Sequence, residues 1–270
     1  MSDTDIATRG LVLLGCGKMG GAMLRGWLDD GLLAESVWVL DPKPSEWLRG
    51  TGVHLNTALP EAPAVVIVAV KPQMVGDALP VLQGYGGGDT MFLSIAAGTT
   101  LASFAAILGD DTPIIRAMPN TPAAVGRGIT ALYGNTNVSE AAMQMGEALL
   151  SGVGQTVRVE READMDAVTA VSGSGPAYVF HLIETMAKAG QAEGLSPALA
   201  MQLAKATVAG AGALAEASEE TPAQLRINVT SPAGTTAAAL DVLMDETEGF
   251  PSLVTRAVQA AAARSRELGH

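Results

Sequence analysis

The sequence predicts an α/β fold, in which a first part of alternating strands and helices is followed by a second part that is all helical. Up to about residue 160, short runs rich in Val, Ile and Leu are separated by segments of helix length. Continuous apolar runs of this kind are typical of parallel strands buried on both faces. Their alternation with helices implies right-handed crossovers and a doubly wound sheet. From Asp164 to Leu268 the sequence offers long Ala- and Leu-rich stretches at helical spacing and no convincing strand.

The order of these segments gives the expected elements. Strands are predicted over residues 11–14, 37–40, 64–70, 91–96, 114–117, 129–133 and 157–159. Helices of the first part are predicted over residues 19–30, 75–82, 101–108 and 139–150. Helices of the second part are predicted over residues 165–193, with an interruption at 172–176, and over 197–217, 237–244 and 253–268. A loop is expected at 219–236, and the two domains are expected to span residues 1–160 and 161–270.

Composition and charge exclude several classes of partner. The 270 residues are 48% hydrophobic and 16% charged, so long disordered tracts are not expected. The formal net charge of −12 repels phosphate backbones and anionic lipids, so we expect neither nucleic acid nor a membrane as a partner. The single cysteine excludes an internal disulfide framework and offers no metal-ligand spacing. The polar, acidic N-terminus is unlike a targeting peptide, and the apolar runs are of strand length, so we expect a cytoplasmic protein.

A glycine-rich loop follows the first predicted strand. It consists of Gly15, Cys16, Gly17, Lys18, Met19 and Gly20, and a helix begins within it. The first glycine permits a tight turn, the second lets the backbone approach a pyrophosphate, and the third lets helix and strand pack closely. The helix N-terminus then presents free N–H groups and the positive end of its dipole to the phosphates. An ordinary turn explains neither the spacing nor the second strand that follows, so the loop predicts a Rossmann-type domain that binds NAD or NADP.

Residues at the ends of the next two strands bear on the cofactor. Asp41 ends the second strand, where an acidic side chain binds the ribose 2′-hydroxyl of NAD. Lys43 follows closely and would attract the extra phosphate of NADP, so both cofactors stay open, as does a simple turn at this point. Lys71 stands just beyond a buried strand, where ligands bind in open α/β sheets, and Pro72 suits the first turn of the next helix. We therefore expect Lys71 to contact the cofactor rather than to be a solvated loop charge.

Three further segments have the composition of binding loops. Residues 94–98 end a strand with small side chains that let a ring approach the backbone. Residues 116–122 end the next strand with two prolines in a polar turn. Residues 228–236 precede a helix, a typical place for backbone N–H groups to bind an anion.

Taken in order, these segments resemble the pyrroline-5-carboxylate reductases, and the resemblance extends from the Gly15 loop almost to the C-terminus. Ser-Gly-Ser-Gly-Pro-Ala-Tyr at 172–178, followed by Ser-Pro-x-Gly-Thr-Thr at 231–236, is specific to that family. Two positions depart from the family pattern. Asp41 stands where many members have a small or amide residue that favours NADP, and Ala233 replaces a frequent glycine, which is tolerable unless its φ is positive. The other matching segments are residues 15–20, 69–72, 94–98, 116–122, 166–169, 249–250 and 264–268.

The resemblance implies an oxidoreductase of the last step of proline biosynthesis. The reaction transfers hydride from nicotinamide C4 of NADPH or NADH to the imine carbon of (S)-1-pyrroline-5-carboxylate and yields L-proline. The expected catalytic residues are Thr236, whose hydroxyl can hydrogen-bond to the imine nitrogen, and Ser231. Backbone N–H groups near Ser231 and over residues 234–236 could hold the substrate carboxylate, each contributing about 1.5–3 kcal/mol when bonded to a charge.

The expected site residues fall into two sets, of which Asn56, Asn228, Glu162 and Glu219 rest on correspondence with the family alone. The substrate-binding residues are Ser231, Gly234, Thr235, Thr236, Gly175, Glu162 and Glu219. The cofactor-binding residues are Gly15, Cys16, Gly17, Lys18, Met19, Gly20, Asp41, Lys43, Asn56, Ala69, Val70, Lys71, Pro72, Ala96, Ala97 and Asn228.

The second domain is also expected to join two copies of the chain. Its Ala-rich helices carry more apolar surface than a domain of about 110 residues can bury alone, which predicts a homodimer. The resemblance implies the same all-helical dimerisation domain, and some relatives assemble such dimers into rings.

Two other functions account for part of the pattern. A β-hydroxyacid dehydrogenase shares the glycine loop and a helical second domain, but it needs a lysine as general base shortly after a Gly-rich helix segment. Here the first lysine after Gly175 is Lys188, which disfavours alcohol chemistry and is neutral for imine reduction. A non-catalytic NAD(P)-sensing protein would need the glycine loop but would have no use for residues 228–236.

Overall fold

The computed structural model describes residues 3–269 and divides them into two compact units. The first unit consists of two segments, one that ends at Gly173 and one that begins at Ala262. The second unit comprises Ser174–Ala261. By compactness, the first unit thus extends beyond the boundary expected near residue 160 and is completed by the last residues of the chain. Each unit is described by itself.

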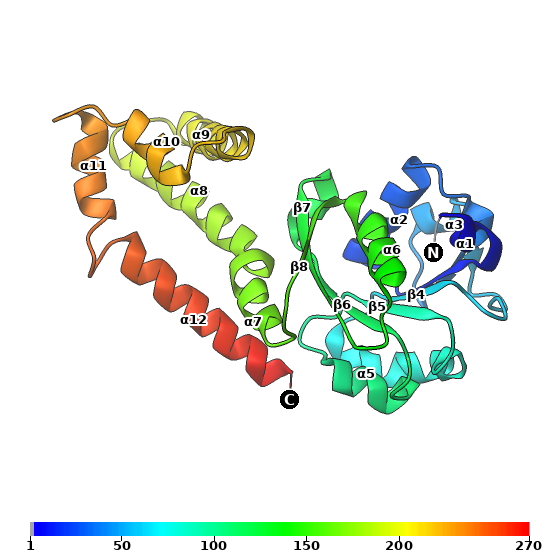
Figure 1. Cartoon of the computed structure of the whole chain (residues 1–270). Coiled ribbons are helices and arrows are strands. Elements are labelled where there is room, and N and C mark those ends of the chain that lie inside the picture. Colours follow the sequence, from blue (N-terminus) through cyan, green and yellow to red (C-terminus); the bar gives the residue numbers. More distant parts are fainter. Residues whose placement is uncertain (1–2, 270) are drawn as a thin grey trace. The chain divides into compact units, whose positions relative to one another are not determined.

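The first unit is built on an eight-stranded sheet of order β3-β2-β1-β4-β5-β6-β7-β8. Figure 1 shows this sheet, with strands β4 to β8 labelled. All neighbouring strands are parallel except β6 and β7, so the predicted doubly wound sheet is confirmed with one antiparallel pair. Residues 119–127 join β6 to β7, and they are too few for the crossover of about a dozen residues that a parallel pair needs. The strands are β1 Leu11–Leu14, β2 Val37–Leu40, β3 His54–Leu55, β4 Val65–Val68, β5 Met91–Ser94, β6 Ile114–Met118, β7 Gly128–Gly134 and β8 Gly154–Arg158.

Helices cover both faces of this sheet. Leu11 and Leu13 of β1 pack in one buried cluster with α2 (Lys18–Asp29) and α6 (Glu140–Ser151). Their neighbours Val12 and Leu14 pack on the opposite face, in a cluster with α4 (Val75–Ala78), the 3-10 segment Leu79–Tyr85 and α5 (Leu101–Leu108). This division is why the central strands read as continuous apolar runs rather than as alternating ones.

Two short helices of the first unit lie outside the predicted set. α1 (Asp3–Arg9) precedes β1, and α3 (Glu46–Arg49) follows β2. α1 is fixed by one buried apolar side chain, Ile6, and by the Arg9 guanidinium, which donates to the carbonyl oxygens of Ala62 and Pro63 at 3.0 and 3.1 Å. A single apolar anchor gives no helical period for a sequence pattern to reveal.

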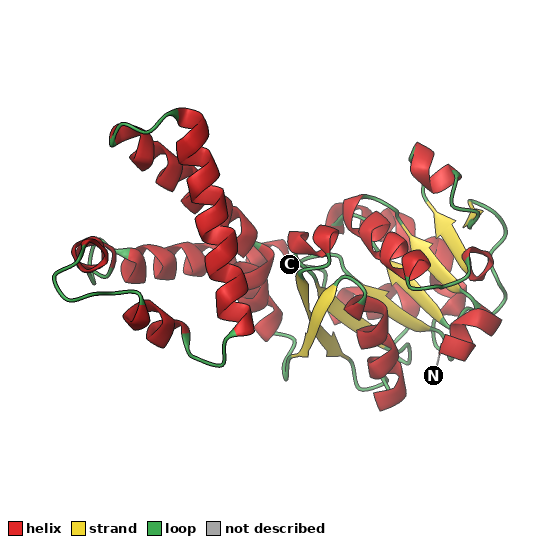
Figure 2. Cartoon of the chain, turned by 90° about the horizontal axis from the view of Figure 1, so that it is seen from above, coloured by secondary structure: helices red, strands yellow, loops and turns green. Residues whose placement is uncertain are grey.

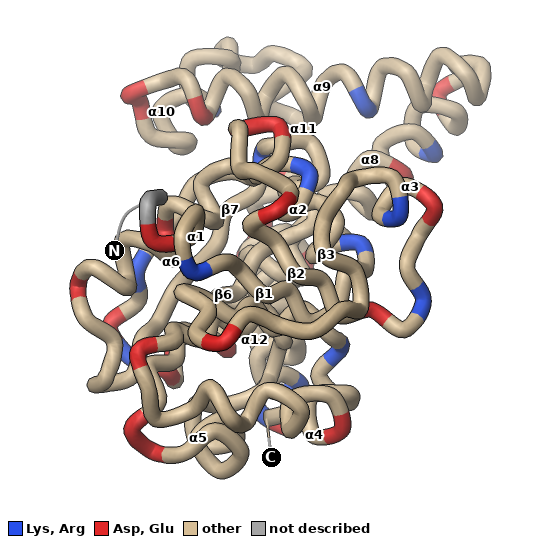
Figure 3. The backbone as a smooth tube through the Cα atoms, turned by 90° about the vertical axis from the view of Figure 1, so that its right-hand side faces the viewer, with Lys and Arg blue, Asp and Glu red and all other residues tan. Residues whose placement is uncertain are grey.

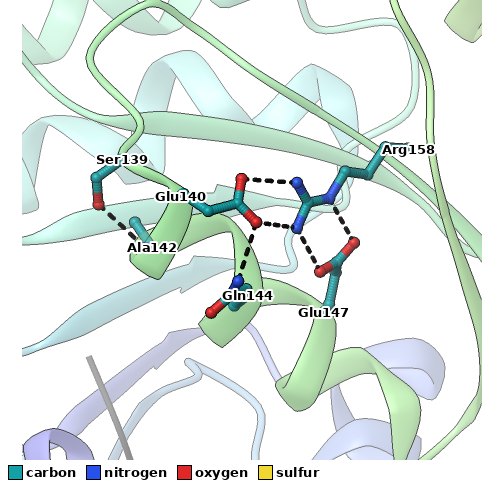
Figure 4. Close-up of polar contacts among 6 residues, drawn as sticks. All are labelled: Ser139, Glu140, Ala142, Gln144, Glu147 and Arg158. Atoms are coloured by element: carbon teal, nitrogen blue, oxygen red, sulfur yellow. Dashed lines mark hydrogen bonds and ion pairs between the residues drawn. The ribbon is translucent and has the colours of Figure 1, made fainter.

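The edge strand β8 is fastened to α6 by a charged cluster (Figure 4). Arg158 on β8 makes paired hydrogen bonds of 2.7–2.8 Å with both carboxylates of Glu140 and Glu147 on α6. Ser139 caps the same helix by accepting from the Ala142 N–H. The guanidinium lowers the pKa of both glutamates through these hydrogen bonds, so the cluster stays ionised at neutral pH.

The regular elements described in the second unit are all helices, and the strands of Figure 2 belong to the first unit. The predicted loop at 219–236 contains a helix, α10, whose Thr221 N-cap and first-turn proline mark its start. Pro176 likewise stands in the first turn of α8 instead of kinking a longer helix, because residues 169–173 form a π-helical turn between α7 (Asp164–Val168) and α8. The helices that belong wholly or in part to this unit are α8 Gly175–Ala192, α9 Pro197–Ala217, α10 Pro222–Asn228, α11 Thr235–Leu243 and α12 Phe250–Leu268.

The second unit has a very small core of its own. Its buried cluster, among the described residues, consists of Ala187, Ala200 and Ala204, with Ile183 and Met201 packed against it. Large apolar side chains such as Phe180 and Val242 are 60% and 72% exposed. One described helix, α9, is long and apolar enough to cross a membrane by length and composition alone, and 11% of that stretch is buried within the chain. The unit therefore leaves apolar helix faces uncovered in a single chain.

Charged residues are distributed over both units, with Asp and Glu interspersed among fewer Lys and Arg (Figure 3). The net charge of −12 is thus spread along the chain instead of being confined to one run. Such a charge keeps copies from associating non-specifically.

Candidate active site

Four strands of the first unit end together at one edge of the sheet. Leu14 of β1 stands beside Leu40 of β2 and Val68 of β4, and Val68 stands beside Ser94 of β5. The loops that follow these strands therefore emerge side by side at the carboxyl edge, which is where open α/β sheets bind ligands. They carry most of the residues predicted to bind the cofactor.

The glycine loop has the geometry that its sequence predicts. Gly15 adopts φ +89°, a conformation that favours glycine, and a Cβ there would lie 2.8 Å from the Val70 side chain. A Cβ on Gly20 would lie 2.5 Å from the Gly15 carbonyl oxygen, so helix and strand approach closely at that point. Gly17 is exposed and no atom lies within 4 Å of a Cβ placed there, which leaves its backbone open to a ligand. α2 begins at Lys18 without a side-chain cap, so its first N–H groups face the same opening.

Asp41 is held rigidly beside this loop. One carboxylate oxygen accepts from the Cys16 N–H at 2.8 Å, and the other accepts from the Lys43 N–H at 2.7 Å. The Asn56 amide pairs with the Asp41 backbone, accepting from its N–H and donating to its carbonyl oxygen at 2.9 and 2.8 Å. Asn56 itself adopts φ +53°, which asparagine tolerates better than most residues. Asp41 and Asn56 thus fix the end of β2 relative to the glycine loop.

The Cys16 thiol is not a nucleophile in this setting. Burial, and to a lesser degree the neighbouring Asp41 carboxylate, raises the pKa of Cys16 to about 11. The thiol is therefore protonated at neutral pH, and Cys16 contributes to the loop through its backbone N–H.

The two remaining loops of the edge follow β4 and β5. Lys71 is exposed and lies at the N-cap of a 3-10 turn that starts with Pro72, as predicted from the proline. Ser94 closes the turn after β5 by accepting from the Ala96 N–H at 3.1 Å. Gly98 adopts φ +75° in that turn. Ala96 is buried and Ala97 is half-buried, so a contact of either residue with a nicotinamide ring stays a prediction.

Glu162 takes part in contacts internal to the first unit. One of its carboxylate oxygens accepts from the Leu101 N–H at 2.8 Å and from the Arg116 guanidinium at 2.5 Å. Leu101 is the first residue of α5, so the carboxylate stands at the positive end of that helix. Arg116, whose side chain is 11% exposed, is a polar residue of the sheet that the expected site residues did not include. A substrate contact by Glu162 stays a prediction.

The loop between α10 and α11 carries the expected substrate residues of the second unit. Gly234 is the N-cap of α11, its N–H donates to the Ser231 carbonyl oxygen at 3.0 Å, and no side chain caps the helix. The N–H groups from Thr235 onward lack intrahelical partners by the geometry of any helix start. Thr236, half-buried, lies in this first turn. The loop therefore offers backbone donors to an anion, with a hydroxyl beside them.

Three further expected site residues of the second unit are Asn228, Glu219 and Gly175. Asn228 donates to a Glu220 carboxylate oxygen at 2.9 Å and accepts from Gln224 at 2.8 Å, so its amide is engaged locally. Glu219 is exposed in the loop before α10. Gly175 begins α8 with open space around it, since a Cβ there would meet no atom within 4 Å. The contacts of these residues with cofactor or substrate stay predictions.

Comparison with known proteins places this chain in a family. Residues 162–268 match the model described as pyrroline-5-carboxylate reductase dimerisation, and residues 10–98 match the model described as NADP oxidoreductase coenzyme F420-dependent. The chain is 39% identical to a pyrroline-5-carboxylate reductase of Pseudomonas aeruginosa over 269 residues, covering 97% of this chain and 98% of the relative. The chain belongs to the pyrroline-5-carboxylate reductase family. The family resemblance expected from the motifs is thereby confirmed.

Other reductases of the family agree in sequence and in fold. A Synechocystis pyrroline-5-carboxylate reductase is 46% identical over 205 residues, 76% of this chain and 75% of the relative. The structure of a pyrroline-5-carboxylate reductase from Coxiella burnetii superposes with a TM-score of 0.91 at 31% identity, covering 97% of this chain and 99% of that one. A Plasmodium falciparum pyrroline carboxylate reductase with NADP bound gives a TM-score of 0.83 at 29% identity, covering 97% and 98%.

Proposed function

We propose that the chain reduces (S)-1-pyrroline-5-carboxylate to L-proline with NADPH or NADH. The observation that carries the proposal is the carboxyl edge of the sheet, where the glycine loop, with Gly17 open and Gly20 tightly packed, adjoins the loops after β2, β4 and β5. Membership of the reductase family supports the same activity, and neither the dehydrogenase nor the sensing alternative is better supported.

The first unit fits a nicotinamide dinucleotide. We assign the pyrophosphate to the backbone of residues 15–20, the adenosine half to the Asp41 side of the edge and the nicotinamide half to the Ala96–Ala97 side. When bound, the cofactor supplies the hydride. The protein itself would orient the cofactor and the imine toward each other and exclude water. Correct orientation lowers the activation barrier of the hydride transfer.

The loop between α10 and α11 is the proposed substrate site. The substrate carboxylate would accept from the free N–H groups at the start of α11, where the helix dipole also favours negative charge, at about 1.5–3 kcal/mol for each such bond. The Thr236 hydroxyl would hydrogen-bond to the imine nitrogen. This arrangement holds an anionic substrate through backbone donors, with no arginine required.

The functional chain is proposed to be a cytoplasmic homodimer joined through the helical unit, with a ring of dimers as the larger assembly. The exposed apolar faces of α8, α9 and α12 and the alanine-sized core of the unit support a partner of the same kind. Burial of α9 against a second copy would account for its apolar composition in a chain with a net charge of −12.

The decisive experiment mixes the protein with pyrroline-5-carboxylate and either NADPH or NADH. Loss of the reduced-cofactor absorbance, with L-proline as the product, is the expected result. Absence of turnover with both cofactors would overturn the proposal.

A substitution at Thr236 tests whether the helical unit contributes to the reaction. Thr236→Ala should lower kcat at least about tenfold while the affinity for the reduced cofactor changes by less than about twofold, because one oriented hydrogen bond to the reacting group is removed. Thr247→Ala is the matched control, since Thr247 is exposed and its hydroxyl donates to the Asp245 carboxylate in the turn before α12. Equal losses of turnover and cofactor affinity in Thr236→Ala would place this residue outside the substrate site.

A further inference from the structure

The last turn of α12 belongs to the first unit and packs on the loop that follows β5. Gly98 is buried, and a Cβ placed on it would lie 3.5 Å from the backbone and the side chain of Leu268. In the opposite direction, a Cβ on Gly269 would lie 2.9 Å from the Gly98 carbonyl oxygen. Residues 268–269 thus contact this loop closely: a Cβ on Gly98 would be in ordinary contact with Leu268, and a Cβ on Gly269 would lie too close to the Gly98 carbonyl oxygen.

A buried hydrogen bond fastens that turn. The Ser265 hydroxyl donates to a carboxylate oxygen of Asp166 at 2.6 Å, across 99 residues of sequence. Ser265 is 6% exposed, and it is a buried polar residue in a helix whose neighbouring side chains, Arg264 and Arg266, are exposed. A hydroxyl bonded to a carboxylate is a strong, directional contact in such surroundings. It ties the last turn of α12, the part that belongs to the first unit, to α7.

The segment that contains Asp166 also contacts the other end of the loop after β5, at Leu101. Glu162, in the segment that leads to α7, accepts from the Leu101 N–H where the loop passes into α5. The segment 162–166 therefore determines the position of residues 94–101 in two ways, directly at Leu101 and through Ser265 and the α12 end at Gly98. Asp166 and Ser265 belong to neither the proposed cofactor site nor the proposed substrate loop.

We infer that Asp166 and Ser265 are positioning residues for the nicotinamide half of the cofactor. This inference rests on the proposed function, which assigns Ala96 and Ala97 to that half. The hydrogen bond between the two side chains holds the end of α12 in contact with Gly98. This contact in turn positions the loop after β5, on which the nicotinamide ring is proposed to lie. The adenosine half lies beside β2, on the other side of β1 and β4 in the sheet order, and is independent of this contact.

The test separates the two halves of the cofactor. Ser265→Ala and Asp166→Ala are compared with the unaltered chain for kcat, for the fluorescence of bound NADPH or NADH, and for the affinity for ADP-ribose and its 2′-phosphate. These last two ligands carry the adenosine half without nicotinamide. We expect kcat to fall about tenfold, because small misplacements of reacting groups have effects of this size or larger. We expect the nicotinamide fluorescence to change and the affinity for the ADP-ribose ligands to stay within about twofold.

Two controls keep the result specific. Asp166→Asn retains an oxygen that can accept from Ser265, so it should restore most of the activity that Asp166→Ala loses. Glu267→Ala breaks the exposed Arg264–Glu267 pair of 2.8 Å on the same turn of α12 and should leave kcat unchanged. Thermal unfolding of each variant shows whether it is folded at the assay temperature, and Ser265→Ala alone suffices if Asp166→Ala is not.

Several outcomes would overturn the inference. An unchanged kcat and nicotinamide fluorescence in folded Ser265→Ala would exclude a positioning role. Equal weakening of the reduced cofactor and of the ADP-ribose ligands would show a general effect on the unit instead. Failure of the unaltered chain to bind or oxidise either reduced cofactor is seen before any variant is made, and it would overturn the proposed function and this inference with it.

Discussion

Ala233 adopts φ +54°, the left-handed conformation that costs a residue with a Cβ about 1–2 kcal/mol. The chain therefore carries local strain in the proposed substrate loop. Replacing Ala233 with glycine should relieve that strain, although glycine also gains entropy in the unfolded chain.

Ala233→Gly is therefore expected to raise the free energy of unfolding by about 0.5–1 kcal/mol, measured by urea denaturation. Ala239→Gly is the matched control, because Ala239 is an exposed residue inside α11. There the same change should lower stability by about 1 kcal/mol. Destabilisation by both changes would contradict a strained Ala233.

At the residue scale, the sequence predicts best those positions whose role is set by the local backbone. Gly15, Gly17 and Gly20 can be read from their spacing because a turn, an open backbone and a close approach each demand glycine. From the sequence alone, the role of Asp41 stays open between a cofactor contact and a turn, and the structure gives its carboxylate two backbone partners. Ser265 and Asp166 could not be paired from the sequence, since 99 residues separate them and neither has a local pattern.

At the scale of elements, the bond between β8 and α6 makes a prediction about pH. Arg158→Gln removes the partner that lowers the pKa of Glu140 and Glu147, and it should lower Tm at pH 7. A carboxyl whose pKa is lower in the folded chain stabilises the fold above its unfolded pKa and loses that contribution as pH falls through its folded pKa. The difference in Tm between the two proteins should therefore shrink toward zero in the acid range.

The measurement is thermal unfolding followed by circular dichroism from pH 7 downward. Arg161→Gln is the comparison, because Arg161 pairs with one carboxylate, Asp164, on the surface of the same unit. It should have the smaller effect, since Arg158 bonds to two carboxylates. A Tm difference for Arg158→Gln that persists unchanged at low pH would show that the effect is not electrostatic.

Helices and strands that are long enough to show a hydrophobic pattern can be predicted from the sequence, whereas very short ones cannot. The strands with buried runs on both faces, and helices such as α9 and α5, agree with the expected segments to within a few residues. β3 has two residues and α1 one buried anchor, so neither displays a period. α10 was hidden inside a segment rich in Pro and Thr, which here supply its N-cap and first turn.

At the scale of the whole molecule, the thin core of the helical unit bears on assembly. Light scattering is expected to give a dimer or a multiple of it, because a unit whose own core is three alanines cannot bury its remaining apolar side chains. Phe180→Glu, on an exposed face of α8, should shift the population toward monomer and lower Tm, whereas Gln202→Glu on α9 adds the same charge in place of an already polar side chain and should do neither. A monomer at all concentrations of the unaltered chain would refute the prediction.

The path of the chain between the two units has a consequence for synthesis. The chain leaves the first unit after Gly173 and returns to it at Ala262, so the helical unit is an insertion that a ribosome completes before it adds the residues that rest on Gly98. Nascent chains fold from the N-terminal side onward as length becomes available. The sheet can therefore form early, while the loop after β5 stays unsupported until residues 262–269 have been added, and the proposed nicotinamide side of the cofactor site is completed only then.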